Sequence, residues 1–157
     1  MAVADERSKL KANLTLFGAD QVNSLVCASD RAYAILTILD SKASGLMTVN
    51  AFLGAFPALS IDHYQKAQDP NCIALWLSLV LIVSLVSSAL LCFMVVRVQW
   101  RWLEFVDEGA GDKFCDKELE HLVDVIIVRT ERYRWAWRVT FACLLGMIAL
   151  AYLYATS

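Results

Sequence analysis

Three long stretches of the chain contain no charged side chain. They cover residues 43–61, 72–96 and 139–157, and are 19, 25 and 19 residues long. A helix needs about 20 apolar residues to cross the hydrocarbon core of a bilayer, which is roughly 30 Å thick. We therefore predict three transmembrane helices, over about 43–61, 72–96 and 136–155.

Helical patterns continue on either side of these spans. From residue 20 to 39, no Gly or Pro interrupts a series of apolar residues at helical spacing: Val22, Leu25, Val26, Ala32, Ile35, Leu36 and Leu39. This pattern predicts a helix that runs straight into the first span. The clearest break in the chain is Gly109–Asp116. A second helix is expected to lead from there into the third span, with an apolar stripe formed by Leu119, Leu122, Val123, Ile126 and Ile127.

These patterns predict an all-α integral membrane protein. Its three transmembrane helices carry cytoplasmic helical extensions at the N-terminus and in mid-chain, and form a small bundle. We expect a flexible segment over residues 1–19 and one helical membrane domain over 20–157, which includes a cytoplasmic helical hairpin over about 97–135. Residues 1–20 lack the apolar core of a cleaved signal peptide, so the first span is expected to act as the targeting signal.

Composition and charge narrow the function classes. Of the 157 residues, 59% are hydrophobic and only 19% are charged, which is untypical of a soluble domain. Five Lys and Arg residues precede the first span, one lies between the first and second, and eight lie between the second and third. The positive-inside rule therefore predicts a cytoplasmic N-terminus and an external C-terminus. A net charge of −2 without a basic block argues against a nucleic-acid-binding surface.

The sequence offers no recognisable catalytic or metal site. Its five cysteines are scattered without a CxxC pair, and its six glycines form no phosphate-binding loop. His63 and His121 lie on opposite predicted sides of the membrane, and neither has a nucleophile or ligand at motif spacing. We expect no catalytic residue, no metal and no cofactor, and a protein that is not an enzyme.

The first span contains the candidate residues for helix packing and assembly: Ser44, Asn50 and Gly54. An unpaired amide in hydrocarbon is costly, so Asn50 is expected to face another helix rather than lipid. Ser44 and Gly54 belong to a face of small residues, with Gly45, Thr48 and Ala51, that would allow close helix contact. Pro57 is expected to loosen or kink the outer end of the span.

Charged residues next to the spans are candidates for ligand binding or gating: Asp30, Arg31, Asp40, Lys42, Arg129, Arg132 and Arg134. Asp30 and Asp40 are ten residues apart, nearly three turns, so they project from about the same side of a helix. They could attract a basic partner or the three arginines. The alternative is an ordinary solvated face, with Lys42 extending its ammonium toward the headgroups.

The entry to the first span resembles that of a known family. The string LDSKASGLMTVNAFLGA matches the pattern D-x-K-A-x-x-x-x-x-x-N of the transmembrane effectors of Pycsar antiphage systems, at Asp40, Lys42, Ala43 and Asn50. The layout of the later spans is also similar, so the likeness covers most of residues 20–155. It implies an effector in the bacterial inner membrane that assembles with itself. Such an effector responds to a cyclic pyrimidine nucleotide from a partner cyclase and then impairs the membrane.

Two other function classes remain open. No separate nucleotide-binding domain is attached to the spans, so sensing could reside in the helical body, in a partner or in oligomerisation. A structural or accessory subunit of a larger membrane complex would have the same small-residue faces and aromatic belts. A small channel or transporter would need more polar groups within the membrane than Asn50 supplies.

Overall fold

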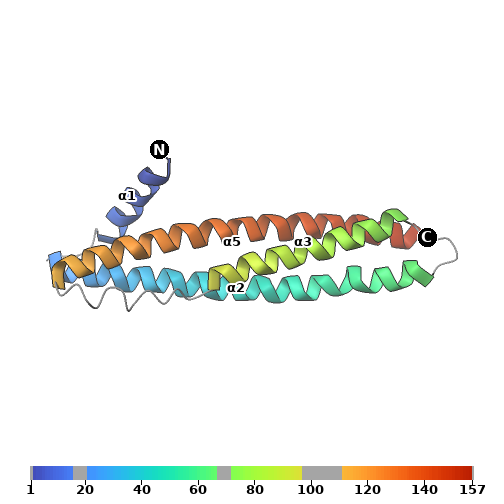
Figure 1. The fold of residues 1–157 in the computed structure, drawn as a ribbon, viewed down its shortest axis with the longest axis horizontal. Helices are drawn as coiled ribbons and strands as arrows, with labels where there is room; N and C mark the ends of the chain where they lie inside the picture. Colours follow the sequence, from blue (N-terminus) through green and yellow to red (C-terminus); the bar gives the residue numbers. More distant parts are fainter. Residues whose placement is uncertain (1, 16–20, 67–71, 97–110, 157) are drawn as a thin grey trace. The chain divides into compact units, whose positions relative to one another are not determined.

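The residues described by the computed structural model are all helical. These residues are 2–15, 21–66, 72–96 and 111–156, and they contain no strand. They form the helices α1 (Ala2–Thr15), α2 (Gln21–Lys66), α3 (Cys72–Val96) and α5 (Gly111–Thr156) (Figure 1). The predicted all-helical fold is confirmed for this part of the chain.

Three of the helices are long and apolar enough to cross a membrane. The portions concerned are Cys27–Asp62, Cys72–Val96 and Lys117–Ala155. The predicted continuous helix before and through the first span is confirmed, because α2 has 46 residues and passes Pro57 without ending. At 1.5 Å per residue, α2 and α5 are each about 69 Å long, which is more than twice the thickness of a hydrocarbon core. Each helix is therefore too long to lie wholly within the hydrocarbon core, and the part outside its apolar run carries charged residues.

The structure differs from the sequence prediction at two places. Residues 2–15 form α1, whereas residues 1–19 were predicted to be a flexible segment. No Gly or Pro interrupts residues 2–15, and Leu14 is buried against the other helices. Helix α5 begins at Gly111, inside the predicted break at Gly109–Asp116. Residues 97–110 of the predicted hairpin lie outside the described residues.

The chain divides into two compact units, both of which use the long helices α2 and α5. Unit 1 contains α1 with residues 21–41 of α2 and 111–131 of α5. Unit 2 contains α3 with residues 42–66 of α2 and 132–156 of α5. Each unit therefore has three helical pieces, with α1 or α3 as the third. The two units have separate cores.

In unit 1, α1 packs on α2 and α5. The buried core consists of Leu14, Ala28, Ala32, Leu36, Leu119, Leu122, Val123 and Ile126. Polar contacts also hold α1. Arg7 Nε lies 2.9 Å from Asp124 Oδ1, and Lys11 Nζ lies 3.1 Å from Glu120 Oε1. Arg31 donates a hydrogen bond of 3.3 Å to the carbonyl oxygen of Leu14. The contacts with α5 explain why the N-terminal segment is ordered as a helix here.

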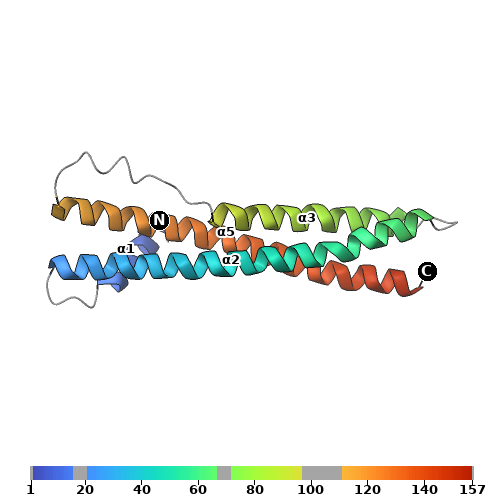
Figure 2. The same cartoon turned by 90° about the horizontal axis from the view of Figure 1, so that it is seen from below.

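In unit 2, α3 runs antiparallel to α2 and α5 (Figures 1 and 2). The buried residues of α3 are spaced alternately four and three apart: Ala74, Ser78, Leu81, Leu85, Ser88, Cys92 and Val95. In α2 the same alternation links Ala43, Leu46 and Asn50, and in α5 it links Ala136, Thr140 and Cys143. A mean repeat of 3.5 residues is the heptad pattern of helices packed as a coiled coil. Several of the buried residues are small, which lets the helix axes approach closely.

A tight contact between α3 and α5 gives a test of this packing. A Cβ atom at Gly146 would lie 2.7 Å from Leu81 Cδ2, whereas one at Gly45 would meet no atom within 4 Å. We predict that Gly146→Leu lowers the free energy of unfolding by about 1–3 kcal/mol, because it overpacks the α3–α5 contact. Gly45→Leu is the matched control and should not destabilise, since leucine has a better helix propensity than glycine. Thermal unfolding followed by circular dichroism measures both. Equal stability of the two variants would contradict the packing described.

Candidate functional site

Three buried polar side chains, one from each helix of unit 2, form a hydrogen-bonded cluster that we call the polar layer: Asn50, Ser88 and Thr140. Asn50 Nδ2 donates to Ser88 Oγ at 2.9 Å. Thr140 Oγ1 donates to Asn50 Oδ1 at 2.8 Å. The two hydroxyl oxygens of Ser88 and Thr140 lie 2.9 Å apart. Each helix of the unit therefore contacts both of the others through this layer.

The hydrogen atoms of the polar layer can be assigned without conflict. The hydroxyl of Thr140 has a single proton, and its two acceptors are Asn50 Oδ1 at 2.8 Å and the carbonyl oxygen of Ala136 at 3.0 Å. Only the first arrangement gives the amide oxygen of Asn50 a donor within the polar layer. Ser88 must then be the donor in its contact with Thr140, or it donates to the carbonyl oxygen of Ala136 at 2.9 Å. Ser88 also accepts from the Asn50 amide, so all three side chains are linked in either arrangement.

Burial makes this pairing necessary. Asn50 is 3% exposed, Thr140 2% and Ser88 0%. A polar group buried without a partner costs about 1–3 kcal/mol, so a slip of one helix along another would carry that cost. One buried Asn at a core position is a known means of fixing the register of packed helices. The polar layer therefore specifies how α2, α3 and α5 align in unit 2.

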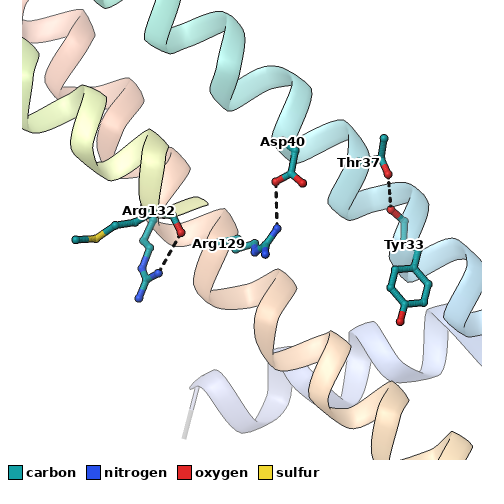
Figure 3. A network of polar contacts seen from close by, with 6 residues as sticks. Tyr33, Thr37, Asp40, Arg129 and Arg132 are labelled. Atoms are coloured by element: carbon teal, nitrogen blue, oxygen red, sulfur yellow. Dashed lines mark hydrogen bonds and ion pairs between the residues drawn. The ribbon is translucent and has the colours of Figure 1, made fainter. Parts of the chain in front are cut away.

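A second polar contact, an ion pair in unit 1, lies on α2 and α5 close to where each helix passes into unit 2. Arg129 Nη1 lies 3.1 Å from Asp40 Oδ1, as Figure 3 shows. The Arg129 side chain is 11% exposed and that of Asp40 36%. An ion pair of this burial is held more firmly than a surface pair, and loss of the carboxylate would leave a largely buried guanidinium.

The structure brings together only two of the seven predicted ligand or gating residues. These are Asp40 and Arg129. Asp30, Lys42 and Arg134 are exposed, and Arg31 is held by the Leu14 carbonyl. The remaining residue, Arg132, donates to the carbonyl oxygen of Met94 at 3.4 Å, in the last turn of α3 (Figure 3).

The predicted packing residues of the first span occupy different environments. Asn50 is buried in the polar layer, Ser44 is exposed and Gly54 is half-buried. A Cβ atom at Gly45 or Gly54 would meet nothing within 4 Å, so these two glycines of the small-residue face make no close contact with another described helix. The face that packs internally carries Ala43, Asn50 and Ser60.

Sequence reasoning missed the partners of Asn50. Four serines, at positions 78, 84, 87 and 88, lie in α3, and only the alternating spacing of buried residues distinguishes Ser78 and Ser88 from the other two. It also missed the hydrogen bond of 2.8 Å from the Tyr33 hydroxyl to Glu118 Oε1 in unit 1. Among the described residues, no group of His, Cys, Asp or Glu side chains is placed to hold a metal ion.

Comparisons with protein-family models, with curated proteins and with solved structures found no match to this chain.

Two adjacent serines provide a direct test of the polar layer. Ser87 is exposed and bonds only the Val83 carbonyl of its own helix, at 2.8 Å, whereas Ser88 links all three helices. We predict that Ser88→Ala lowers the free energy of unfolding by about 1 kcal/mol. Ser87→Ala should change it by less than about 0.5 kcal/mol, as is usual for exposed positions. Thermal unfolding of the two variants measures the difference, and similar values would remove the special role assigned to Ser88.

The ion pair can be tested with a second matched pair on α2. Asp40→Asn removes the carboxylate that faces Arg129 and should destabilise the protein by about 1 kcal/mol, a value reduced by the partial exposure of Asp40. Asp30→Asn makes the same change at an exposed position and should have almost no effect. Exchange of the two charges, with Asp40→Arg and Arg129→Asp combined, should recover part of the loss. If Asp30→Asn is as destabilising as Asp40→Asn, the ion pair does not stabilise unit 1.

Proposed function

We propose that this chain is a multi-pass protein of the bacterial inner membrane, with a cytoplasmic N-terminus and an external C-terminus. The exposed surface of unit 2 supports this proposal, because large apolar side chains such as Phe52, Ile73 and Trp76 are 84%, 72% and 70% exposed. Apolar surface of this extent is unfavourable in water and favourable in hydrocarbon. The distribution of Lys and Arg along the chain supports the orientation.

Within that membrane, the chain acts as an effector of an antiphage system that signals through a cyclic pyrimidine nucleotide. The observation that carries this proposal is the position of the residues that resemble the Pycsar effectors. Asp40 is paired with Arg129, Ala43 is fully buried and Asn50 belongs to the polar layer. These residues lie on α2 where unit 1 ends and unit 2 begins, and Lys42 is exposed beside them. A signal received in unit 1 would have to pass this part of α2 to reach the membrane.

In the mechanism, the protein has two states: separate protomers and an assembly of several protomers. Asn50 is satisfied inside one chain, so assembly with further copies uses outward faces such as the one that carries Ser44, Gly45 and Thr48. Three helices packed on a shared core leave no water path, and membrane damage therefore requires several protomers. A ligand that binds the assembled state more tightly increases the population of that state. An anionic nucleotide would compete with Asp40 for Arg129, which makes this ion pair the site of differential contact.

The experiment is controlled expression in bacteria with a potential-sensitive dye. Depolarisation and growth arrest are expected when the chain and a cyclic pyrimidine nucleotide are both present, and neither is expected with one of them alone. Arg129→Gln should abolish the response to nucleotide by removing the cation that a phosphate would bind. Arg31→Gln is a matched control in unit 1 that should keep it.

A well-inserted protein that leaves the membrane potential unchanged under every nucleotide would contradict the effector function. That result would favour an accessory subunit of a larger complex. Such a subunit should be unstable without its partner.

A further inference from the structure

Two arginines on α5 point away from the core of unit 2. Arg134 and Arg138 are both exposed and lie four residues apart, so their Cβ atoms are about 5–6 Å from each other on one face of the helix. Arg134 has no ion-pair or hydrogen-bond partner among the described residues. Arg138 Cζ lies 5.2 Å from the centre of the Trp135 ring, which holds the guanidinium at the surface by a cation–π contact.

The surroundings of these arginines change from polar to apolar along the helix. Trp135 and Trp137 are 58% and 46% exposed, and Trp137 packs against Phe141 with ring centres 6.3 Å apart. Phe141 and Leu145 continue the outward face three and seven residues after Arg138, and both are exposed. Arg138 is the last charged residue of the chain. The outward face therefore presents two cations with the indole rings between them, and then an apolar surface.

This order matches the parts of one phospholipid molecule. Guanidinium groups bind phosphate oxygens in pairs of hydrogen bonds, and indole rings favour the depth of the headgroups. Acyl chains would cover Phe141 and Leu145 one to two turns further along α5. Two unneutralised positive charges favour a headgroup with net negative charge over a zwitterionic one, because a zwitterionic headgroup brings its own ammonium to the site.

We propose that Arg134 and Arg138, with Trp135 and Trp137, form a binding site for an anionic phospholipid on the outward face of α5. The site requires the membrane insertion of the proposed function, but not the response to nucleotide. It assigns Arg134 to the lipid rather than to the nucleotide. Arg129, whose side chain is only 11% exposed and is paired with Asp40, has the opposite environment.

The test is native mass spectrometry of the full chain released from mixed bilayers of phosphatidylglycerol and phosphatidylcholine. The wild-type protein should retain phosphatidylglycerol in preference to phosphatidylcholine. Arg134→Gln combined with Arg138→Gln should reduce that preference by roughly thirtyfold, since each of the two cations near the surface contributes about 1 kcal/mol. Lys9→Gln combined with Lys117→Gln removes the same charge from exposed positions in unit 1 and should leave the preference intact.

A variant with lysine at both positions keeps the two positive charges. It therefore shows whether a loss of lipid preference in the glutamine variant comes from the lost charge or from a disturbed fold. Arg134→Lys combined with Arg138→Lys should keep most of the preference, because both charges remain. Equal retention of the two lipids by the wild-type protein would overturn the proposal, as would a loss of preference in the unit 1 control or in the lysine variant. A chain that is absent from the membrane fraction and carries neither lipid would instead overturn membrane insertion. The lipid site would then be overturned with it.

Discussion

The buried amide of Asn50 is the constraint on which the rest of unit 2 depends. An amide in an apolar core needs a donor and an acceptor from its neighbours, and here they come from Ser88 on α3 and Thr140 on α5. Apolar side chains can slide past one another at small cost, whereas a slip of one helix would break the hydrogen bonds that join these three groups. The polar layer thus contributes more to specificity than to the total stability of the unit.

The rest of unit 2 consists of a packed core, in which the polar layer fixes the helix alignment, and of an outward-facing surface. Small residues on the packed faces let the helices approach, as at the half-buried Gly146, where an added Cβ atom would lie 2.7 Å from Leu81 Cδ2. The outward faces then carry the large apolar residues, which are available to lipid or to further copies of the chain. Unit 1 has no comparable polar layer among its described residues. It is held by an apolar core that includes Leu14 and by charged pairs, of which Asp40–Arg129 is the least exposed.

The sequence predicts the helices well because they depend on local patterns. Runs of uncharged residues identify the three apolar helices, and the absence of Gly and Pro from residues 20–39 correctly predicts that α2 continues into the first span. Pairings between distant residues depend on register, which single-helix patterns do not contain. The choice of Ser88 among four serines and of Arg129 among eight basic residues of the later chain therefore required the structure, as did the docking of α1 through Leu14. The alternating spacing of apolar and small residues in α3 is the one signal in the sequence that could have identified Ser88.

Cross-linking in bilayers tests most directly whether α3 and α5 are aligned as the polar layer requires, with Ser88 facing Thr140. The experiment uses a variant whose five native cysteines are replaced by alanine and which has a protease site introduced between α3 and α5. Ser88→Cys combined with Thr140→Cys should form a disulfide on mild oxidation that keeps the two fragments together after cleavage, since the native hydroxyl oxygens are 2.9 Å apart. Ser87→Cys combined with Thr140→Cys should not. Equal cross-linking of both pairs, or linkage through position 87 alone, would contradict the register on which this account is based.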